Sequence, residues 1–248
     1  MNLLRRHAFC AVLGAALVAT GCASAGPADD FFTAVKRDNA GAISRLLQSG
    51  FNPNLKDAKG DGGLIIAIRE PSPRSLKVLL DSPATRAEVR NANDESPLMM
   101  AAIKGQLDVV RQLIAKDADV NKTGWTPLHY AVSAGGPDQL AIARLLLDAS
   151  AYIDAESPNR TTPLMMAARY GSEQAVKLLF DEGADPTLRN EQGLTAADFA
   201  RKAEREDLAA QLDQAAARYR KPAGPANSGG PGSPASSGSP ANMPRKNW

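Results

Sequence analysis

The sequence predicts an all-α helical solenoid of about six helix-turn-helix units, joined by short β-hairpin fingertips. Three observations lead to this prediction: a seven-residue motif recurs, a second apolar stretch follows each copy, and turn residues close each unit. The motif prolines Pro97, Pro127 and Pro163 are 30 and 36 residues apart, an average of 33. A period of this length is typical of stacked repeats in which each unit contacts only its neighbours.

The first helix of each clear unit begins at the motif, which reads SPLMMAA at 96–102, TPLHYAV at 126–132 and TPLMMAA at 162–168. A Ser or Thr before the proline can cap a helix, and proline at the first helical position loses no hydrogen bond. The alanines are small enough for neighbouring helices to approach closely. Because the paired methionines adjoin these alanines, we expect Met99-Met100 and Met165-Met166 to pack between helices.

The second helix of each unit follows as an apolar stretch, and in one copy Val176, Leu179 and Phe180 share a helical face. Gly105 and Gly171 stand at the turn between the paired helices. Neither helix can bury its apolar side alone, so the units must stack and the terminal units must be polar outside.

The repeat domain is predicted over residues 29–218. Two irregular loops interrupt it between paired helices, one at Pro71 and Pro73 and one at Gly135-Gly136-Pro137. The predicted units are three clear repeats at 96–125, 126–161 and 162–194, and three degenerate repeats at 29–61, 62–95 and 195–218.

These residues resemble the ankyrin repeat. The Thr-Pro-Leu-His opening at 126–129, the central glycine and the closing Gly-Ala-Asp at 183–185 occur in the family's order and at its period. The resemblance implies a protein-binding solenoid whose fingertips and exposed first-helix positions form a concave strip. It places the fingertips at 57–61, 91–95, 121–125, 157–161 and 190–194.

The resemblance also indicates which side chains a partner would meet on this strip. Trp, Tyr and Arg most often dominate binding energy, and Trp125 stands before a helix at a position that many repeats leave polar, so we expect it to be exposed. The predicted partner-binding residues are Lys59, Arg69, Asn93, Lys104, Lys122, Trp125, Arg160, Arg169, Tyr170 and Glu191.

The sequence contains little that could perform catalysis. Beyond residue 25 it has one histidine, His129, and no cysteine, so it lacks the residues for a zinc site or a thiol nucleophile. The resemblance implies a helix-start role for His129. We therefore predict no enzyme, no metal and no cofactor; a carboxylate enzyme remains an alternative, and it would require a closed pocket with perturbed acids.

Composition and charge exclude other classes of protein. The 248 residues are 44% hydrophobic and 23% charged, with 29 Lys and Arg against 27 Asp and Glu. A transmembrane bundle and a strongly basic nucleic-acid binder both need compositions far from this one. We therefore expect a protein partner, no nucleic acid, and a monomer.

Residues 1–25 have the layout of a secretory signal peptide: Arg5 and Arg6 precede an apolar run at 8–19 and then small residues. The run is shorter than the roughly 20 residues that span a bilayer as a helix. Two processing sites compete. Ala23-Ser24-Ala25 fits release of a soluble protein, whereas the residues ending at Cys22 resemble a bacterial lipobox, with a lipid anchor at Cys22. The expected location is periplasmic or lipid-anchored to the envelope membrane.

The carboxyl end has a different composition. Residues 222–248 contain six prolines and five glycines among Ser, Ala and Asn. A segment of this kind cannot bury enough apolar area to offset its ordering entropy, so a disordered tail is predicted.

The sequence therefore favours a non-enzymatic protein-binding scaffold in the bacterial cell envelope. Its resemblance to exported bacterial ankyrin proteins implies a role in protecting or supporting an envelope enzyme. The alternative is a secreted effector or inhibitor that binds host or competitor proteins; lipidation at Cys22 would argue against secretion.

Overall fold

The computed structural model describes residues 26–219, and within them it contains twelve helices and no strand. This confirms the predicted all-α solenoid. The helices are α1 (Pro27–Lys36), α2 (Ala40–Gln48), α3 (Gly63–Arg69), α4 (Pro73–Asp81), α5 (Pro97–Ile103), α6 (Leu107–Ala115), α7 (Pro127–Ser133), α8 (Gln139–Asp148), α9 (Pro163–Tyr170), α10 (Glu173–Asp181), α11 (Ala196–Arg201) and α12 (Glu206–Arg218).

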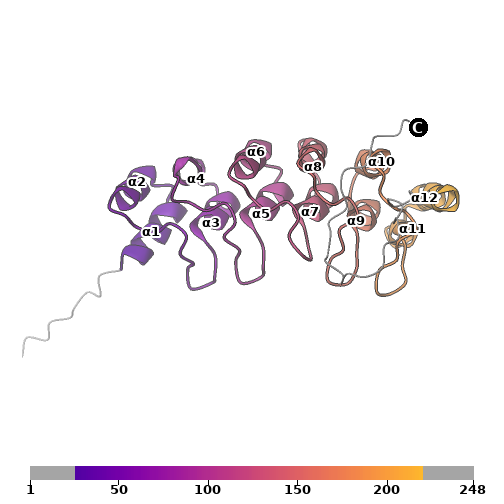
Figure 1. Ribbon diagram of the computed structural model, residues 1–248, viewed down its shortest axis with the longest axis horizontal. Coiled ribbons are helices and arrows are strands. Elements are labelled where there is room, and N and C mark those ends of the chain that lie inside the picture. The colour runs from indigo at the N-terminus through magenta and orange to yellow at the C-terminus, as the bar shows by residue number, and fades with distance from the viewer. Residues whose placement is uncertain (1–25, 220–248) are drawn as a thin grey trace, which may run out of the picture.

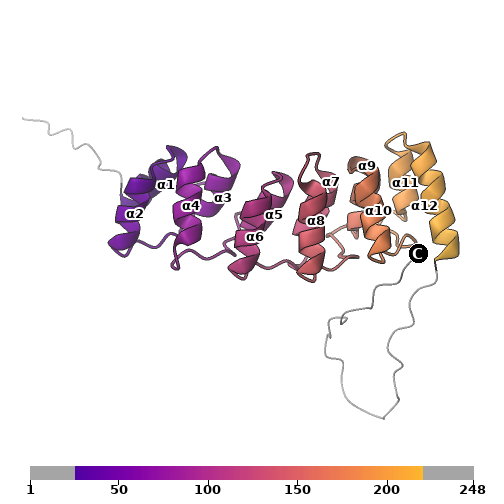
Figure 2. The same ribbon diagram turned by 90° about the horizontal axis from the view of Figure 1, so that it is seen from above.

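The helices pair into six units that stack in one row, from unit 1 (α1 and α2) to unit 6 (α11 and α12). Figure 1 shows the odd-numbered inner helices side by side above the loops that join the units, which we call fingertips. The outer helices α2 to α10 form a second layer, and Figure 2 shows the same order from above. Each inner helix contacts the inner helices before and after it, as expected for a solenoid.

The starts of the inner helices α5, α7 and α9 show how the repeated motif acts. Ser96 Oγ accepts a hydrogen bond from the Met99 amide at 3.2 Å, and the Ser96 amide in turn donates to Met99 Sδ at 3.5 Å. Thr162 and Met165 repeat this reciprocal cap. In unit 4 the imidazole of His129 takes the place of the methionine sulfur. In unit 6 the Asp198 carboxylate does so, accepting from the Thr195 amide at 2.9 Å, so one geometry is built from three different side chains.

A single apolar core runs through all six units. One row of fully buried side chains comes from equivalent positions of the outer helices, which explains why no helix is stable alone. This row consists of Leu79, Leu113, Leu146 and Leu179.

Polar contacts also join neighbouring units behind the inner helices. Gln106 Nε2 donates to the Ile68 carbonyl at 3.1 Å, and Gln139 Nε2 donates to the Ile103 carbonyl at 3.3 Å. At the corresponding place in unit 5 the backbone itself approaches unit 4. A Cβ on Gly171 would lie 2.1 Å from the Val132 carbonyl oxygen, so glycine is required there.

The fingertips are tight loops, not the predicted β-hairpins. Within residues 26–219 the only bridge is the isolated one between Lys56 and Gly62. Four fingertips are closed by one hydrogen bond from the amide of the first residue to the carbonyl of the fifth. They are 57–61 at 2.9 Å, 91–95 at 3.0 Å, 157–161 at 3.0 Å and 190–194 at 3.0 Å.

The third fingertip, 121–125, differs from the prediction. The side chain of Asn121 bonds to the Ser150 carbonyl and the Tyr152 amide of the next unit, as Asn54 does with Ala84 and Arg86. Asn54 lies three residues before its fingertip, so Asn121 precedes the loop instead of opening it. This fingertip is therefore about three residues shorter than the others, and Figure 1 shows the loop before α7 ending short of its neighbours.

Three predictions from the sequence lie outside the described residues: the signal peptide at 1–25, the lipid anchor at Cys22 and the disordered tail at 222–248. None of the helices between residues 26 and 219 has the length and apolar character needed to cross a membrane.

Candidate functional site

A pocket of about 310 Å³ lies on the concave strip across units 4, 5 and 6. Two fingertips, one shortened loop and the inner helices α9 and α11 contribute to its wall. It is lined by Trp125, Asn159, Thr161, Met166, Arg169, Tyr170, Asn190, Gln192, Leu194, Phe199 and Lys202.

The repeat geometry explains why these residues meet. Positions three apart on a helix share one face, so the fourth and seventh residues of each inner helix point to the same strip. In units 5 and 6 these are Met166 with Arg169 and Phe199 with Lys202. The five units from 2 to 6 have Ile66, Met100, Tyr130, Met166 and Phe199 at the fourth position, and Arg69, Ile103, Ser133, Arg169 and Lys202 at the seventh.

Aromatic rings give the pocket an apolar wall. The Trp125 ring meets the His129 ring edge to face, with 5.3 Å between centroids, and lies 6.4 Å from Tyr130. Trp125 is thus half-buried, less exposed than predicted, but it reaches the pocket. Tyr170 is 56% exposed, and the Arg169 guanidinium lies 5.1 Å from its ring centroid. The Arg169–Tyr170 pair is a cation–π contact at the pocket rim.

His129 lies behind this wall as a structural residue. Its Nδ1 accepts a hydrogen bond from the Thr126 amide at 3.2 Å, and its Nε2 lies 2.9 Å from the Thr161 carbonyl oxygen. Since a carbonyl only accepts, Nε2 carries the proton. Burial lowers the pKa of His129 from 6.5 to about 4, although the bonds to backbone carbonyls oppose this. The ring is therefore neutral at pH 7.

Three cations of the predicted strip are paired within the protein. Arg69 donates two hydrogen bonds to the Asp61 carboxylate, at 2.6 and 3.1 Å. The Arg69 guanidinium lowers the pKa of Asp61 despite the burial of that carboxyl. Arg160 pairs with Glu156 at 3.0 Å, and this bond raises the pKa of Arg160.

The third of these cations, Lys122, was expected on the surface, and this expectation is wrong. Its side chain is 3% exposed, and its Nζ lies 2.6 Å from an Asp94 carboxylate oxygen. The same Nζ donates to the carbonyls of Thr123 and Trp125. Lys122 thus fastens the shortened third fingertip to the second and is not available to a partner.

Other cations have no carboxylate within ion-pair distance among residues 26–219. In the pocket these are Arg169 and Lys202, and elsewhere on the strip they are Lys59 and Lys104. An ion pair that already exists must be broken before a partner's carboxylate can replace it, whereas an unpaired cation is free to bind one. The pocket therefore contains two cations, Arg169 and Lys202, that are available to an anion.

Of the ten predicted strip residues, the pocket brings together three: Trp125, Arg169 and Tyr170. The remaining surface residues are distributed along the strip, with Lys59, Asn93, Lys104, Arg160 and Glu191 exposed and Arg69 half-buried.

Sequence reasoning missed Phe199 and Lys202 because the degenerate sixth unit was not aligned position by position. Counting the fourth and seventh residues after Thr195 would have found both. It also assigned Met166 to helix packing alone, whereas this half-buried side chain lines the pocket. Met165, its neighbour, is buried as expected.

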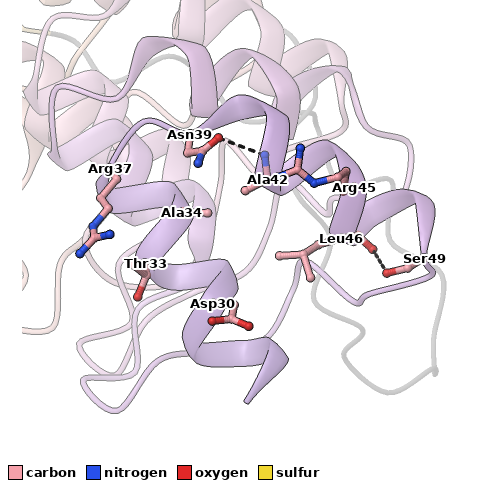
Figure 3. A pocket seen from close by; sticks show the side chains of 9 residues that line it. All are labelled: Asp30, Thr33, Ala34, Arg37, Asn39, Ala42, Arg45, Leu46 and Ser49. Carbon is pink, nitrogen blue, oxygen red and sulfur yellow. Dashed lines mark hydrogen bonds between the residues drawn. The ribbon is translucent and has the colours of Figure 1, made fainter. Parts of the chain in front are cut away.

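Figure 3 shows a second pocket, of about 460 Å³, between α1 and α2. Thr33 and Arg37 on its wall are exposed, whereas Phe31 on the other face of α1 packs against α3 at Gly63. This pocket therefore lies on the outer side of unit 1, the first unit of residues 26–219. It is the polar end surface that a terminal repeat needs.

The grouping and the pKa shifts of the acids of residues 26–219 bear on metal binding and on general acid catalysis. Between residues 26 and 219, no three His, Cys, Asp or Glu side chains gather as a metal site. The carboxyl groups there with a shifted pKa are Asp38, Asp61, Asp94 and Asp198, and each shift is downward. A general acid needs the opposite shift.

The chain is similar to a solved structure and to several known proteins. One solved structure is a complex of a predatory endopeptidase from Bdellovibrio bacteriovorus with an immunity protein. A chain of this complex matches the present chain with a TM-score of 0.63 and 26% identity. The match covers 75% of this chain and 97% of that one. A putative ankyrin repeat-containing protein of Treponema pallidum is 27% identical over 174 residues, covering 70% of this chain and 47% of that protein.

The nuclear factor NF-kappa-B p105 subunit of Gallus gallus is 33% identical over 164 residues. The alignment spans 63% of this chain but only 16% of that relative. The similarity therefore concerns the repeat region and not the whole relative.

Family models for ankyrin repeats match most of the described chain. A model of three copies matches residues 31–123 and again 64–157, and a model of many copies matches 146–200. Such repeats indicate protein–protein interaction and are generally non-enzymatic binding scaffolds. The chain belongs to the ankyrin repeat family.

Proposed function

We propose that this protein is a non-enzymatic scaffold of the bacterial cell envelope that binds an enzyme through its concave strip and so protects or restrains it. The observation that supports this most directly is the pocket across units 4 to 6. It combines the exposed Tyr170, the half-buried Trp125 and two cations that pair with no carboxylate of residues 26–219. Aromatic and arginine side chains of this kind are those that most often anchor protein interfaces.

The nature of the partner is suggested by the structural neighbour, an immunity protein bound to an endopeptidase. Its match extends over nearly the whole neighbouring chain, so similarity covers the unit stack as well as single repeats. An enzyme partner for the present chain follows by analogy, and the open strip is the surface that such a partner would use.

The envelope location is supported by the sequence of residues 1–25, with its basic start, apolar run and small residues. Soluble export and lipid attachment at Cys22 are both compatible with this pattern.

The test is affinity capture from envelope extract with the wild-type chain and a Trp125→Ala, Tyr170→Ala double variant. A Tyr152→Ala variant is the control, because Tyr152 is 40% exposed and lies outside the pocket. All proteins must melt at the same temperature, since Trp125 contacts His129. We expect the wild type and the control to capture an enzyme, and the double variant to lose it. Equal capture by the double variant would contradict binding through the strip.

Secretion as an inhibitor of host or competitor proteins is the second candidate, and the endopeptidase bound by the structural neighbour favours it, because it is an example of an enzyme as the bound protein. Cell fractionation of the wild type and Cys22→Ser separates the two. Retention of the wild type in the membrane fraction, with release of the variant, supports the envelope scaffold. Wild type in the culture medium supports the secreted inhibitor.

A further inference from the structure

We propose that the pocket across units 4 to 6 recognises an extended acidic segment of its partner, in which a carboxylate side chain is flanked by an apolar one. This inference rests on the proposed function and specifies the chemistry of the same site. It follows from a comparison of equivalent positions in the repeats, from the wall of the pocket and from its entrance.

Among the cations at the seventh inner-helix position of units 2 to 6, Arg69 of unit 2 is the one that a described carboxylate neutralises. There Arg69 meets Asp61, the fifth residue of the preceding fingertip, at 2.6 Å. Asn91, the first residue of the next fingertip, supports the same carboxylate with an Nδ2 bond of 3.1 Å. The repeat thus has a built place for one carboxylate between a cation and a fingertip amide.

In unit 5 the cation is kept and the carboxylate is missing. Arg169 stands where Arg69 stands, and Asn190 stands where Asn91 stands, but Thr161 takes the place of Asp61. In unit 6, Lys202 likewise has Leu194 at the fifth fingertip position. The side chains named here from units 5 and 6 and from their fingertips all line the pocket, and none of them is acidic. The carboxylate that completes the arrangement must therefore come from outside the described chain.

The wall of the pocket determines what accompanies this carboxylate. Met166, Phe199 and Trp125 present apolar surface beside the two cations. A volume of about 310 Å³ is at the small end for ligand pockets and suits one or two side chains. An acidic residue next to a Leu or an aromatic residue satisfies both the charges and the apolar wall.

The entrance favours an extended segment. The short third fingertip leaves the unit 4 side of the pocket without a full-length loop, as the loop before α7 in Figure 1 shows. A partner chain can therefore run along the strip into the pocket without meeting a fingertip there. A helix is too wide for a site of this volume.

The experiment is selection of 12-residue peptides displayed on phage against the purified chain, in parallel with an Arg169→Glu, Lys202→Glu variant. The control is Arg86→Glu, Arg144→Glu, which makes the same charge change at two exposed arginines outside the pocket. We expect wild type and control to enrich peptides with Asp or Glu beside Leu, Phe or Trp, and the pocket variant to lose them. Synthetic peptides from the selection should bind the single Arg169→Ala variant roughly two- to fivefold more weakly.

Two results would overturn the inference: enrichment without a preference for acids, or equal binding of the acidic peptides to the pocket variant. Failure to enrich any peptide on the wild type would also count against it. Because purified protein and synthetic peptides are used, these results are independent of partner capture. A partner lost by the Trp125 and Tyr170 double variant but retained by the charge-reversed variant would leave the proposed function standing and remove the acidic segment.

Discussion

The two halves of the concave strip are built from the same repeat and differ in how their charges are used. In the amino-terminal half, Arg69 is held by Asp61, and Lys122 is buried against Asp94. In the carboxy-terminal half, Arg169 and Lys202 line a pocket without a carboxylate partner in the described chain. For the inner-helix cations the difference arises at the fifth fingertip position, which is Asp61 before Arg69 but Thr161 before Arg169 and Leu194 before Lys202.

A basic residue on a repeat surface therefore cannot be assigned to binding by its type alone. The same seventh-position cation closes an internal ion pair in unit 2 and is available in unit 5. The residue eight positions before it along the chain decides which of the two applies.

The largest effect on stability is expected for core substitutions, which test whether the two halves share one core. Leu79→Ala and Leu179→Ala replace equivalent, fully buried side chains on α4 and α10. Each should lower the free energy of unfolding by about 2–5 kcal/mol, because each leaves a cavity between units. Urea melts of both variants measure this. A loss below about 0.5 kcal/mol for either would contradict the register that makes them equivalent.

A second prediction uses the histidine at the boundary between the halves. The pKa of His129 is about 4 in the folded chain against 6.5 for a free imidazole. Below pH 6.5 the unfolded chain binds a proton that the folded chain does not, so acid favours unfolding. Stability is therefore complete above pH 6.5 and is lost as the pH falls toward about 4, by roughly 3 kcal/mol in all.

The control for this titration is His129→Met, since Met99 and Met165 occupy the same position in units 3 and 5. Methionine does not titrate, so urea melts of this variant at pH 7 and pH 4.5 should differ less than those of the wild type. Equal pH dependence in both proteins would mean that another group is responsible.

A third prediction breaks the charge arrangement of the amino-terminal half. Asp61→Asn removes the carboxylate that Arg69 and Asn91 share, and should cost about 1–3 kcal/mol, limited by the 36% exposure of the Arg69 side chain. Asp181→Asn is the comparison, because its pair with Lys177 is well exposed and should contribute less than about 1 kcal/mol. Thermal melts with equal losses for both variants would show that the Asp61 pair is no stronger than a surface pair.

The smallest effect is expected for a substitution that gives the carboxy-terminal half the charge arrangement of the amino-terminal half. Thr161→Asp places a carboxylate opposite Arg169, as Asp61 lies opposite Arg69, and should weaken binding of an acidic peptide roughly two- to fivefold. Thr161→Asn is the control of nearly the same shape without charge. Fluorescence anisotropy measures both, and the halves would not be equivalent if the aspartate left binding unchanged.

Most of the fold could be predicted from the sequence because local signals agree with tertiary packing. A Thr or Ser before Pro begins an inner helix, and the apolar spacing around Leu179 identifies its buried face. The third fingertip could not be placed in this way. Asn121 has the residue type that opens a fingertip, and only its bonds to the next unit show that it precedes one.

The site was predicted only in part, for a related reason. Trp125, Arg169 and Tyr170 were found by residue type and repeat position. The burial of Lys122 depends on Asp94 from another fingertip, which is close in space and distant in the chain. Lys202 lies in a unit without the Thr-Pro-Leu signature, where residue type alone gives no reason to select it.

The position of the pocket near one end of the stack has a consequence for hydrogen exchange. Solenoid ends open more readily than their middles, and Phe199 and Lys202 belong to the last unit, which is held chiefly by contacts of α11 with α9 and α12. Each opening of α11 and α12 therefore dismantles the site. A segment bound across α9 and α11 must be released before this end can open. Binding should therefore slow hydrogen exchange at the amides of α12. Slower exchange there would report occupancy of a site that those amides do not touch.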